Sequence, residues 1–333
     1  MIEKYVDYLG ADPEFFFEKG SKVLESGAVV KEKGGIDTWG KGKIIKDGFQ
    51  GEFNPSHNTC RQSFMWNIFN LMYHVNQMGY KVRLGAGYWI PETEFADLTN
   101  DSKVFGCIPS ENIYGRQPLG ADPMKYMFRP AGGHIHLSLG RIAKKHVVDL
   151  VKLLDIMVGN TSVAFDQDPL STERRKNYGR AGEFRLKSYG VEYRTLSNFW
   201  LSHYIYGSMV FGLARQAISI VQYTDDAKGL IELIGADAET AINTNDKELA
   251  IKNFKKLEEY FTTKFKVENE YDDQKFTLTN LTYKNLLNAM EFGFEFKKYE
   301  LDPKKYVDYL LNNNTLGSGI EQTLLHEYTF KNK

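Results

Sequence analysis

Residues 177–200, NYGRAGEFRLKSYGVEYRTLSNFW, combine a two-residue alternation with charges that sort onto single faces. Successive side chains of a β-strand point to opposite faces, so this pattern is typical of strands. Tyr189 and Gly190 supply a turn in the middle of the stretch. We therefore predict a hairpin with an apolar face of Phe, Leu, Val and Tyr. Its other face would carry Glu183, Arg185, Lys187, Glu192 and Arg194.

Three other segments place reactive side chains on one face of a strand in the same way. GGHIHLSLG (132–140) aligns His134 and His136 with Ser138, and its Ile and Leu residues point to the other side. GADPEFFFEKG (10–20) kinks at its Asp-Pro and then places Glu14 on one face of a strand. GEFNP (51–55) presents Glu52 in the same manner. An ordinary half-exposed sheet carries a mixture of Thr, Lys, Ser and Glu on its solvent side.

The residue types on this face predict a metal–nucleotide site. Glu carboxylates suit Mg²⁺ or Mn²⁺, and imidazole tolerates these ions when water completes the shell. Guanidinium groups match phosphate oxygens. Each motif also has a structural explanation. The His-x-His pair could be plain sheet surface, and the Glu and Arg pairs could be cross-strand salt bridges on a solvated face. A cupin would need a Glu soon after the His-x-His, and an amidohydrolase would need a regular barrel.

Composition excludes several other classes of protein. The 333 residues carry 42 Lys and Arg against 43 Asp and Glu, which gives no basic surface for nucleic acid or anionic lipid. The two cysteines, Cys60 and Cys107, form no CxxC motif, which favours a reducing compartment. The N-terminus has no apolar signal-peptide region, and the apolar run near 205–221 is too short and polar to span a bilayer. We expect no nucleic-acid or membrane partner and a cytoplasmic location, in the host cytoplasm if the chain is phage-encoded.

The hydrophobic pattern also predicts the order of elements. We expect helices over 56–80, ended by Gly79, over 143–158, and over 196–221. The passage 91–130 is rich in loops and should surround the mouth of the site. The predicted fold class is α+β: a curved antiparallel sheet with a charged concave face, backed by helices. Residues 1–224 would form the catalytic domain, and 225–333 a helical C-terminal extension packed on it.

Five blocks of this sequence together resemble the phage-type carboxylate–amine ligases (amidoligases, type 2), a branch of the glutamine synthetase superfamily. The blocks are GADPEFF (10–16), GEFNP (51–55), GCIPSEN (106–112), GGHIHLSLG (132–140) and YGRAGEFRLKSYGVEYRTLSNFW (178–200). They follow the order of the family, and the last two also resemble the Gly-x-His-x-His and Glu-x-Arg strands of glutamine synthetase. In GCIPSEN, Ser110 stands where the family leads us to expect an acid, with Glu111 beside it.

The resemblance implies a glutamine synthetase-like catalytic fold and a role for each matching residue. Glu192 and His134 would hold the metal that binds the terminal phosphate of the nucleotide, and Glu14 and Glu52 would hold a second metal. His136 would contact the nucleotide. The groups implied to bind phosphate oxygens or stabilise the transferred phosphoryl group are Arg185, Arg194, Arg180 and Lys187. The base that deprotonates the amine is not fixed by the resemblance, with Glu183 and Glu94 as candidates.

The function that the resemblance implies is an ATP- and Mg²⁺-dependent ligation of a carboxylate to an amine through an acyl phosphate, with Mn²⁺ as an alternative ion. The substrates would be small molecules or peptides. Two other functions remain open at this stage. One is a phosphagen-type kinase on the same scaffold, which would phosphorylate and stop. The other is a virion or assembly protein that keeps the scaffold without catalysis.

Overall fold

The structure is a computed structural model, and the part that it describes excludes both ends of the chain. The described residues are 8–38, 40–105, 110–117, 120–138, 146–166 and 168–271. The side chains of residues 205 and 265–271 lie outside this description. The part of the predicted C-terminal extension after residue 271 also lies outside it, as does Cys107.

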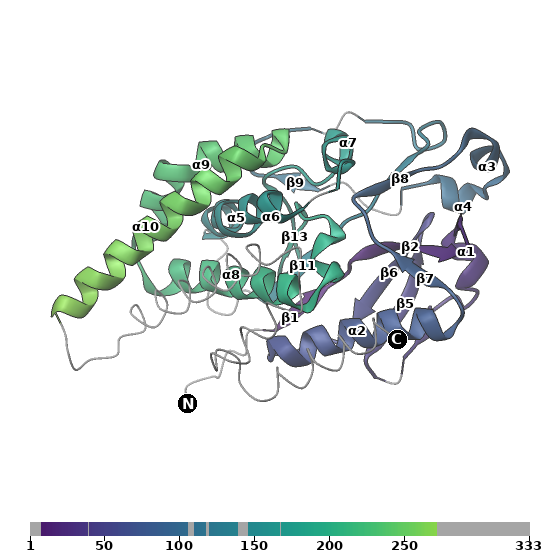
Figure 1. Ribbon diagram of the computed structural model, residues 1–333, viewed down its shortest axis with the longest axis horizontal. Helices are drawn as coiled ribbons and strands as arrows, with labels where there is room; N and C mark the ends of the chain where they lie inside the picture. Colours follow the sequence, from purple (N-terminus) through teal and green to yellow (C-terminus); the bar gives the residue numbers. More distant parts are fainter. Residues whose placement is uncertain are drawn as a thin grey trace.

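A five-stranded antiparallel sheet occupies the centre of the molecule (Figure 1). Its strands, in spatial order, are β1 (Leu9–Ala11), β11 (Ile135–Ser138), β13 (Gly190–Tyr193), β12 (Glu183–Leu186) and β9 (Glu111–Asn112). The predicted hairpin is confirmed, because β12 and β13 pair with Arg185 opposite Glu192. On the other side of β13, His136 pairs with the same glutamate. The register therefore aligns three reactive side chains across neighbouring strands.

A second antiparallel sheet continues from the first, and together they form a curled half-barrel. Its strands are β3 (Lys22–Leu24), β2 (Glu14–Lys19), β6 (Gln50–Pro55), β5 (Gly42–Asp47), β4 (Ile36–Asp37) and β7 (Lys81–Arg83), which pairs with β2. A small sheet joins β8 (Gly87–Trp89) to β10 (Phe128–Pro130). Asp12 and Pro13 form the predicted kink where the chain passes from β1 to β2. The Pro13 carbonyl accepts from Phe53 N and Gly132 O accepts from Glu14 N, so this kink ties the sheets together.

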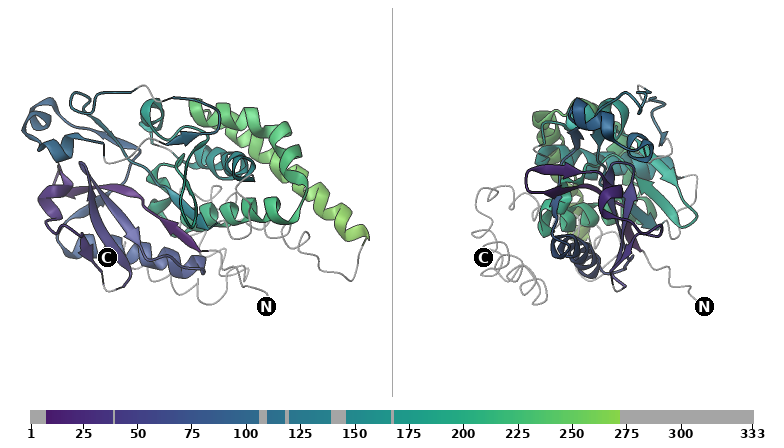
Figure 2. Two further views of the ribbon diagram at one scale, coloured as in Figure 1. Left: turned by 180° about the vertical axis from the view of Figure 1, so that it is seen from behind. Right: turned by 90° about the vertical axis from the view of Figure 1, so that its right-hand side faces the viewer.

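Helices cover the apolar side of the sheets and fill one end of the molecule (Figures 1 and 2). The longer ones are α2 (Arg61–Gln77), α5 (Val147–Leu154), α8 (Tyr204–Tyr223), α9 (Asp226–Thr244) and α10 (Lys247–Tyr271). The shorter ones are α1 (Ser26–Val29), α3 (Glu92–Asp97), α4 (Asn100–Lys103), α6 (Asn160–Phe165), α7 (Ser171–Asn177) and two non-α turns, η2 (Asp155–Gly159) and η3 (Asn198–Ser202). The predicted mixed α+β class with a curved antiparallel sheet is confirmed.

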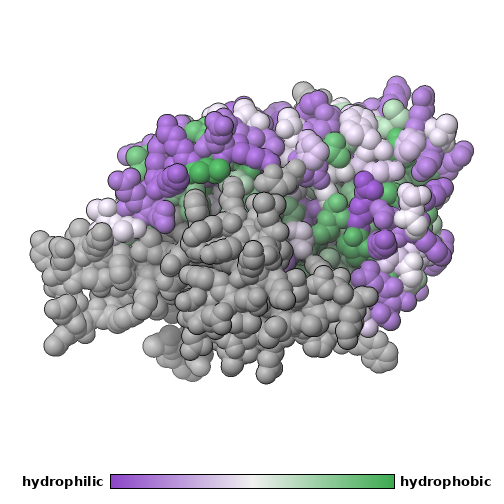
Figure 3. Space-filling view, in the orientation of Figure 1, coloured by the Kyte–Doolittle hydropathy of each residue, from purple (hydrophilic) through white to green (hydrophobic). Residues whose placement is uncertain are grey.

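One large hydrophobic core joins the sheets to the helices. Ile135 and Leu137 of β11 and Val191 of β13 are fully buried in it, which leaves the His and Glu side chains of these strands on the opposite face. Phe254 of α10 and Ile234 of α9 belong to the same core. The helices after residue 224 thus pack on the body of the molecule, while their outward face in Figure 3 is mainly hydrophilic. The division into two domains at this point stays a prediction.

The predicted helix over 56–80 is confirmed in its core and shorter at its start. Its stripe of Phe64, Ile68, Leu71 and Val75 is completely buried. Gly79 adopts a positive φ of 82° and ends the helix as expected. Ser56 and Asn58 are N-cap residues by type, but the helix begins at Arg61 with Cys60 at the N-cap. The Asn58 side chain instead accepts from the Cys60 amide just outside the helix.

The predicted helix over 143–158 changes its hydrogen bonding at a buried acid. The helix α5 passes into the π-helical turn η2 at Asp155 and continues as α6. A single π-turn inside a helix re-aims one side chain. The Asp155 carboxylate accepts from Tyr193 Oη at 2.7 Å, Gly182 N at 3.1 Å and Tyr114 Oη at 3.0 Å. Burial raises the pKa of this carboxylate to about 7, although the three hydrogen bonds act to lower it. Asp155 therefore connects the helical layer to β13 and the loop before β12.

We expect Tyr193→Phe to destabilise the protein by ~1–3 kcal/mol above pH 7, because a buried carboxylate loses a donor. The pKa of Asp155 is raised, so the native state holds its proton below pH 7 and the lost bond there is the weaker neutral one. The cost should therefore be smaller at pH 5. Urea unfolding at pH 5 and pH 8 measures both values. Tyr73→Phe on the exposed side of α2 is the control, with a change within ~0.5 kcal/mol. An equal cost at both pH values would contradict this role of Asp155.

Candidate active site

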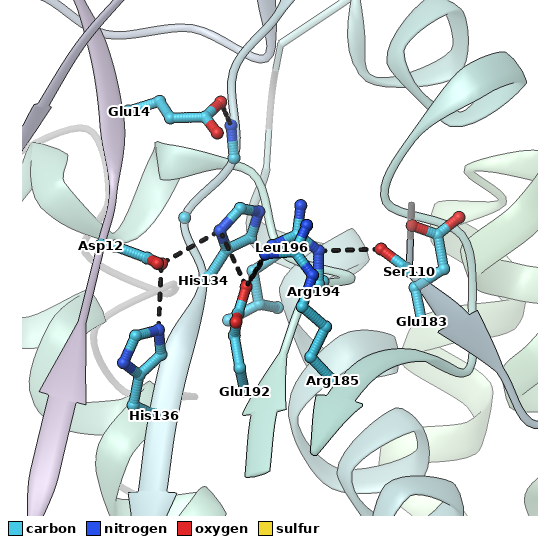
Figure 4. Close-up of polar contacts among 12 residues, drawn as sticks. Asp12, Glu14, Ser110, His134, His136, Glu183, Arg185, Glu192, Arg194 and Leu196 are labelled. Carbon is cyan, nitrogen blue, oxygen red and sulfur yellow. Dashed lines mark hydrogen bonds and ion pairs between the residues drawn. The ribbon is translucent and has the colours of Figure 1, made fainter. Parts of the chain in front are cut away.

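Three potential metal ligands converge where β1, β11 and β13 meet the kink before β2 (Figure 4). Asp12, His134 and Glu192 each offer one ligand atom, and these atoms all lie within 4.8 Å of one another. His134 Nδ1 is 3.0 Å from Asp12 Oδ1 and 3.8 Å from Glu192 Oε1. His134 and Glu192 are buried. The sequence placed the imidazole and Glu192 together, and the structure adds Asp12 to them.

Two glycines allow the chain to bring this imidazole so close to the acids. A Cβ at Gly132 would collide with the His134 ring, and a Cβ at Gly133 would collide with Ser197 O and the Trp200 indole. Trp200 Nε1 donates to Gly133 O at 2.9 Å, which holds this segment against the core. The Gly132 amide donates to Glu14 Oε2 at 2.7 Å. The paired glycines thus position both His134 and Glu14.

Tyr178 lies behind His134 and fixes the ring. Its hydroxyl contacts His134 Nε2, lies 3.2 Å from Glu14 Oε1, and accepts from Arg194 Nη2 at 3.1 Å. Burial and the Arg194 charge lower the pKa of His134 to about 4, so the imidazole is neutral at pH 7. When Tyr178 donates its proton to Glu14, His134 must carry its own proton on Nε2. The Nδ1 lone pair then faces the oxygens of Asp12 and Glu192.

Cationic side chains surround Glu192 on the sheet face. Arg194 Nη1 pairs with Glu192 Oε1, Lys187 Nζ lies 2.8 Å from Oε2, and Arg185 Nη1 lies 3.6 Å from Oε1. Burial and the Asp12 charge raise the pKa of Glu192, but Arg194, His134 and Lys187 outweigh them, so its pKa is lowered overall. The contacts of Arg185 and Lys187 with Glu192 are also the cross-strand salt bridges that the purely structural explanation of these residues expects. The site therefore holds a carboxylate that stays ionised beside three cations.

Arg194 links this cluster to the loop before β9. Its Nε donates to Ser110 Oγ at 2.8 Å, and its guanidinium lies over the Tyr178 ring at 5.1 Å. Arg174 also lies over this ring, 4.8 Å from its centroid. Ser110, the residue that departs from the expected acid, thus serves as a hydrogen-bond acceptor for a buried guanidinium. Glu111 is exposed on β9.

A second group of acids lies next to the first, on the neighbouring sheet. Glu14 of β2 and Glu52 of β6 are directly paired across the strands. Burial and the Asp47 charge raise the pKa of Glu14 to about 7, and burial and the Asp12 charge raise the pKa of Asp47 to about 6. Burial and four neighbouring acids raise the pKa of Glu52 well above its usual value. Carboxylates crowded in this way resist ionisation unless a cation compensates them.

His136 lies between a cavity of about 410 Å³ and the group of three potential metal ligands, Asp12, His134 and Glu192 (the metal-ligand group). Its Nε2 lies 3.1 Å from Asp12 Oδ1, and its Nδ1 is 2.9 Å from Tyr189 Oη. Two half-exposed tyrosines, Tyr8 and Tyr189, line the cavity with His57. His57 makes an edge contact with Tyr8 at 4.9 Å. A planar group could stack in this cavity while its polar end reached His136.

The structure brings most of the predicted residues together, but not Arg180. Its guanidinium donates to the carbonyls of Arg175, Lys176 and Gln117 and lines a different cavity. Of the two candidate bases, Glu183 is buried and accepts from Gly179 N at 3.0 Å. Glu94 lies on α3.

Sequence reasoning missed Asp12, Asp47 and Tyr178 as members of the site. Asp12 could have been found, because it precedes Glu14 by two residues and so shares its face. Asp47 has no such signal, since it ends β5 before a turn and reaches the site only through sheet pairing. Tyr178 stands in the quoted block, but only the folded loop 178–182 brings its hydroxyl to His134.

The fold and site define an α+β protein with buried carboxylate and imidazole ligands beside a cationic sheet face. The sequence model of one family, phage phiEco32-like COOH.NH2 ligase-type 2, matches residues 108–281, more than half of the chain. The chain belongs to this family, whose name describes ligases that join a carboxylate to an amine. The match includes His134, Glu192 and Arg194, whereas β1, β2 and β6 precede it. No curated protein matches the sequence. Within the described residues, no helix is both long and apolar enough to cross a membrane.

Proposed function

We propose that the protein uses ATP and a divalent cation, Mg²⁺ or Mn²⁺, to join a carboxylate to an amine through an acyl phosphate. The observation that carries this proposal is the convergence of Asp12, His134 and Glu192 beside the guanidinium and ammonium groups of the hairpin. The family name supports a ligase that joins these two groups. The nucleotide, the ion and the intermediate are our inference from the site.

The ligand atoms fit a divalent cation by chemistry and by spacing. Two carboxylates and a neutral imidazole suit Mg²⁺ or Mn²⁺, and ligand distances of ~2.0–2.6 Å require donor atoms about 3–4 Å apart. The 3.0 and 3.8 Å spacings from His134 Nδ1 meet this requirement. In the tautomer described above, three acceptors face one another with no proton between them, an arrangement that a cation would stabilise. Glu14 and Glu52 would hold a second ion in the adjacent acidic group. Bound ions would neutralise phosphate oxygens during phosphoryl transfer.

The residues of the hairpin would bind and align the phosphates. Arg185, Arg194 and Lys187 present cationic groups on one face, and a guanidinium can bind two phosphate oxygens at once. Transfer of a phosphoryl group depends on alignment and on neutralising crowded oxygens. The cavity beside His136 would take the base and ribose, with His136 between it and Asp12. Arg180 remains a predicted contributor, although its guanidinium faces the other cavity.

The proposed reaction has two balanced steps. A carboxylate oxygen attacks the γ-phosphorus of ATP, the bond to the bridging oxygen breaks, and ADP leaves. The amine nitrogen then attacks the acyl carbon, the carbon–oxygen bond to phosphate breaks, and inorganic phosphate and a proton are released. The base that accepts this proton stays a prediction, with Glu183 and Glu94 as candidates. Binding the acid next to the phosphate, with water excluded, favours the amide over hydrolysis.

Hydroxylamine tests the ligase step without knowledge of the natural amine. We expect ADP release and hydroxamate formation to depend together on a carboxylate, chosen from a panel of amino acids, small acids and peptides. With an ¹⁸O-labelled carboxylate, one label should appear in the inorganic phosphate. A phosphorylated product that is stable to hydroxylamine would favour the phosphagen-type kinase instead. Failure of ATP with Mg²⁺ to raise the melting temperature would favour the non-catalytic assembly protein.

Tyr178→Phe tests whether the phenol orients the His134 ring. Residues that orient a metal ligand typically change metal affinity by ~10–100-fold. We expect this variant to bind Mn²⁺ more weakly within that range and to keep its fold, because the ring that contacts Arg174 and Arg194 is retained. Isothermal titration with Mn²⁺ measures the affinity. Tyr223→Phe, at an exposed tyrosine at the end of α8, is the control. Unchanged Mn²⁺ binding in the Tyr178 variant would contradict the role.

A further inference from the structure

A second cationic cavity lies apart from the metal-ligand group, between the end of α9 and the loop before β12. It measures about 300 Å³ and is lined by Arg116, Gln117, Arg175, Arg180 and Asn243. Liquid water occupies ~30 Å³ per molecule, so this volume admits a polyatomic ligand. The lining comes from α7, the loop that follows it, α9 and the loop after β9, so the fold assembles it from three distant parts of the chain.

The charges around this cavity are not balanced by the protein. Arg116 pairs with Glu239, with Nη2 2.5 Å from Oε1. Among the described residues, no carboxylate forms an ion pair with Arg175 or Arg180. Arg180 donates only to backbone carbonyls, and Arg175 Nη1 donates to the Asn245 amide oxygen at 2.7 Å. Asp166 acts on Arg175 through space without an ion pair, so neither guanidinium group is directly paired with a carboxylate. Burial and the Arg174 charge lower the pKa of Arg175 only to about 10, so it stays charged at neutral pH.

Two buried donors on the cavity wall have no hydrogen-bond partner. They are Arg175 Nε and Asn243 Nδ2. Arg175 is only 6% exposed, so bulk water cannot supply the acceptor that its Nε–H group lacks. Buried donors without partners are rare in native proteins and each costs ~1–3 kcal/mol. The partial negative charge at the C-terminus of α9 stabilises Arg175 in part, but it leaves these N–H groups unused. An anion in the cavity would bring acceptor oxygens and negative charge next to the residues that carry these donors.

We propose that this cavity is a binding site for a phosphate dianion, either free phosphate or the phosphate of a small phosphomonoester. Two guanidinium groups without ion pairs match a double negative charge, and their forked donors match tetrahedral oxygens. A single carboxylate would leave one positive charge unpaired. The site lies apart from the proposed metal site, but it contains Arg180, a predicted contributor to phosphoryl transfer, which belongs to the same loop as Tyr178. Thr195 Oγ1 holds that loop by donating to Arg180 O at 2.9 Å.

Asn243→Asp is the sharpest variant for this site. The Asn243 oxygen accepts from Ala181 N at 3.1 Å, and Asp keeps an oxygen there while it replaces the orphaned Nδ2 with negative charge. We expect the unliganded variant to melt at a higher temperature than wild type, because the cations gain a partner. Asn100→Asp makes the same charge change on exposed α4 and serves as the control. It should leave anion binding unchanged.

Isothermal titration of the full chain, without metal or nucleotide, is the binding test, with inorganic phosphate, glycerol phosphate and acetate as separate ligands. We expect wild type to bind a phosphate ligand with a Kd of ~1 mM or tighter and to bind acetate more weakly. Tighter binding of the ester than of inorganic phosphate would identify a phosphomonoester as the source. Asn243→Asp should weaken phosphate binding by about 10–100-fold, the loss of a charged hydrogen bond.

Arg116→Gln provides a second variant in case Asn243→Asp does not fold, since Arg116 is half-exposed. It should also weaken phosphate binding about 10-fold or more. Phosphate could bind the sheet-face cations as well, so the difference between variants and control decides the assignment. Equal phosphate binding by wild type and both cavity variants would overturn the proposal. So would acetate binding as tight as that of phosphate.

Discussion

Replacing Glu192 by Gln should weaken Mn²⁺ binding by at least ~100-fold, beyond the usual effect of residues that only orient a ligand. Glu192 is a buried carboxylate with a lowered pKa, and Gln keeps its shape while removing its charge. ATP turnover should fall by ~10²–10³-fold or more, because the phosphate oxygens would lose their neutralising partner. Mn²⁺ titration and ADP release under saturating substrate measure the two effects.

The Glu192 variant needs a control that separates charge from position. Glu92→Gln, at an exposed acid on α3, makes the same charge change away from the site. It should keep both Mn²⁺ affinity and turnover. If Glu192 has only a structural role and forms salt bridges with its neighbours, Glu192→Gln should lose stability but keep its Mn²⁺ affinity. A Glu192→Gln protein that unfolds more easily yet binds Mn²⁺ like wild type would therefore overturn our assignment.

Arg194→Lys should lower turnover by ~10²–10³-fold even though the charge is kept. The guanidinium contacts Glu192, Ser110 and Tyr178 from three of its edges, and an ammonium group cannot span these positions. Leaving a buried carboxylate poorly paired also costs stability, typically ~3–5 kcal/mol when a partner is lost altogether. We expect part of that cost here. Urea unfolding and steady-state ADP release, measured in parallel, distinguish misfolding from lost catalysis.

The matched substitution for Arg194 is Arg83→Lys, at an exposed pair with Glu18. Surface ion pairs contribute ~0–1 kcal/mol, so stability and turnover should both stay near wild type. A fully active Arg194→Lys protein would show that the forked geometry is unnecessary. Arg194 would then be a general source of positive charge, and the alignment that we propose for the phosphates would be wrong.

The sheet was predictable from the sequence because period-two alternation fixes which face a side chain occupies. Burial of one face then leaves a single register, and the hairpin around Tyr189 follows. That logic predicts Arg185, Glu192 and His136 on one face of the sheet. It could not place Asp47 or Arg180, because their neighbours are decided by long-range pairing and by loop conformation. It also missed the π-turn at Asp155, since helical periodicity continues through a one-residue change in hydrogen bonding.

Local sequence patterns also failed at helix starts and at the orphaned donors. Ser56 and Asn58 are good N-cap residues by type, yet tertiary contacts start α2 at Arg61. The cavity around Arg175 has no motif at all, because its residues lie on α7, α9 and two loops. Three arginines spread over 65 positions give no spacing signal. Only the assembled structure shows that their charges converge.

Crystals grown with an ATP analogue and Mn²⁺ would test the central claim most directly, because anomalous scattering locates the ion without assumptions about chemistry. We predict that the anomalous peak places Mn²⁺ within coordination distance of Asp12, His134 and Glu192. The terminal phosphate should lie beside Arg185 and Arg194. A peak elsewhere, or triphosphate density away from the hairpin face, would contradict the account.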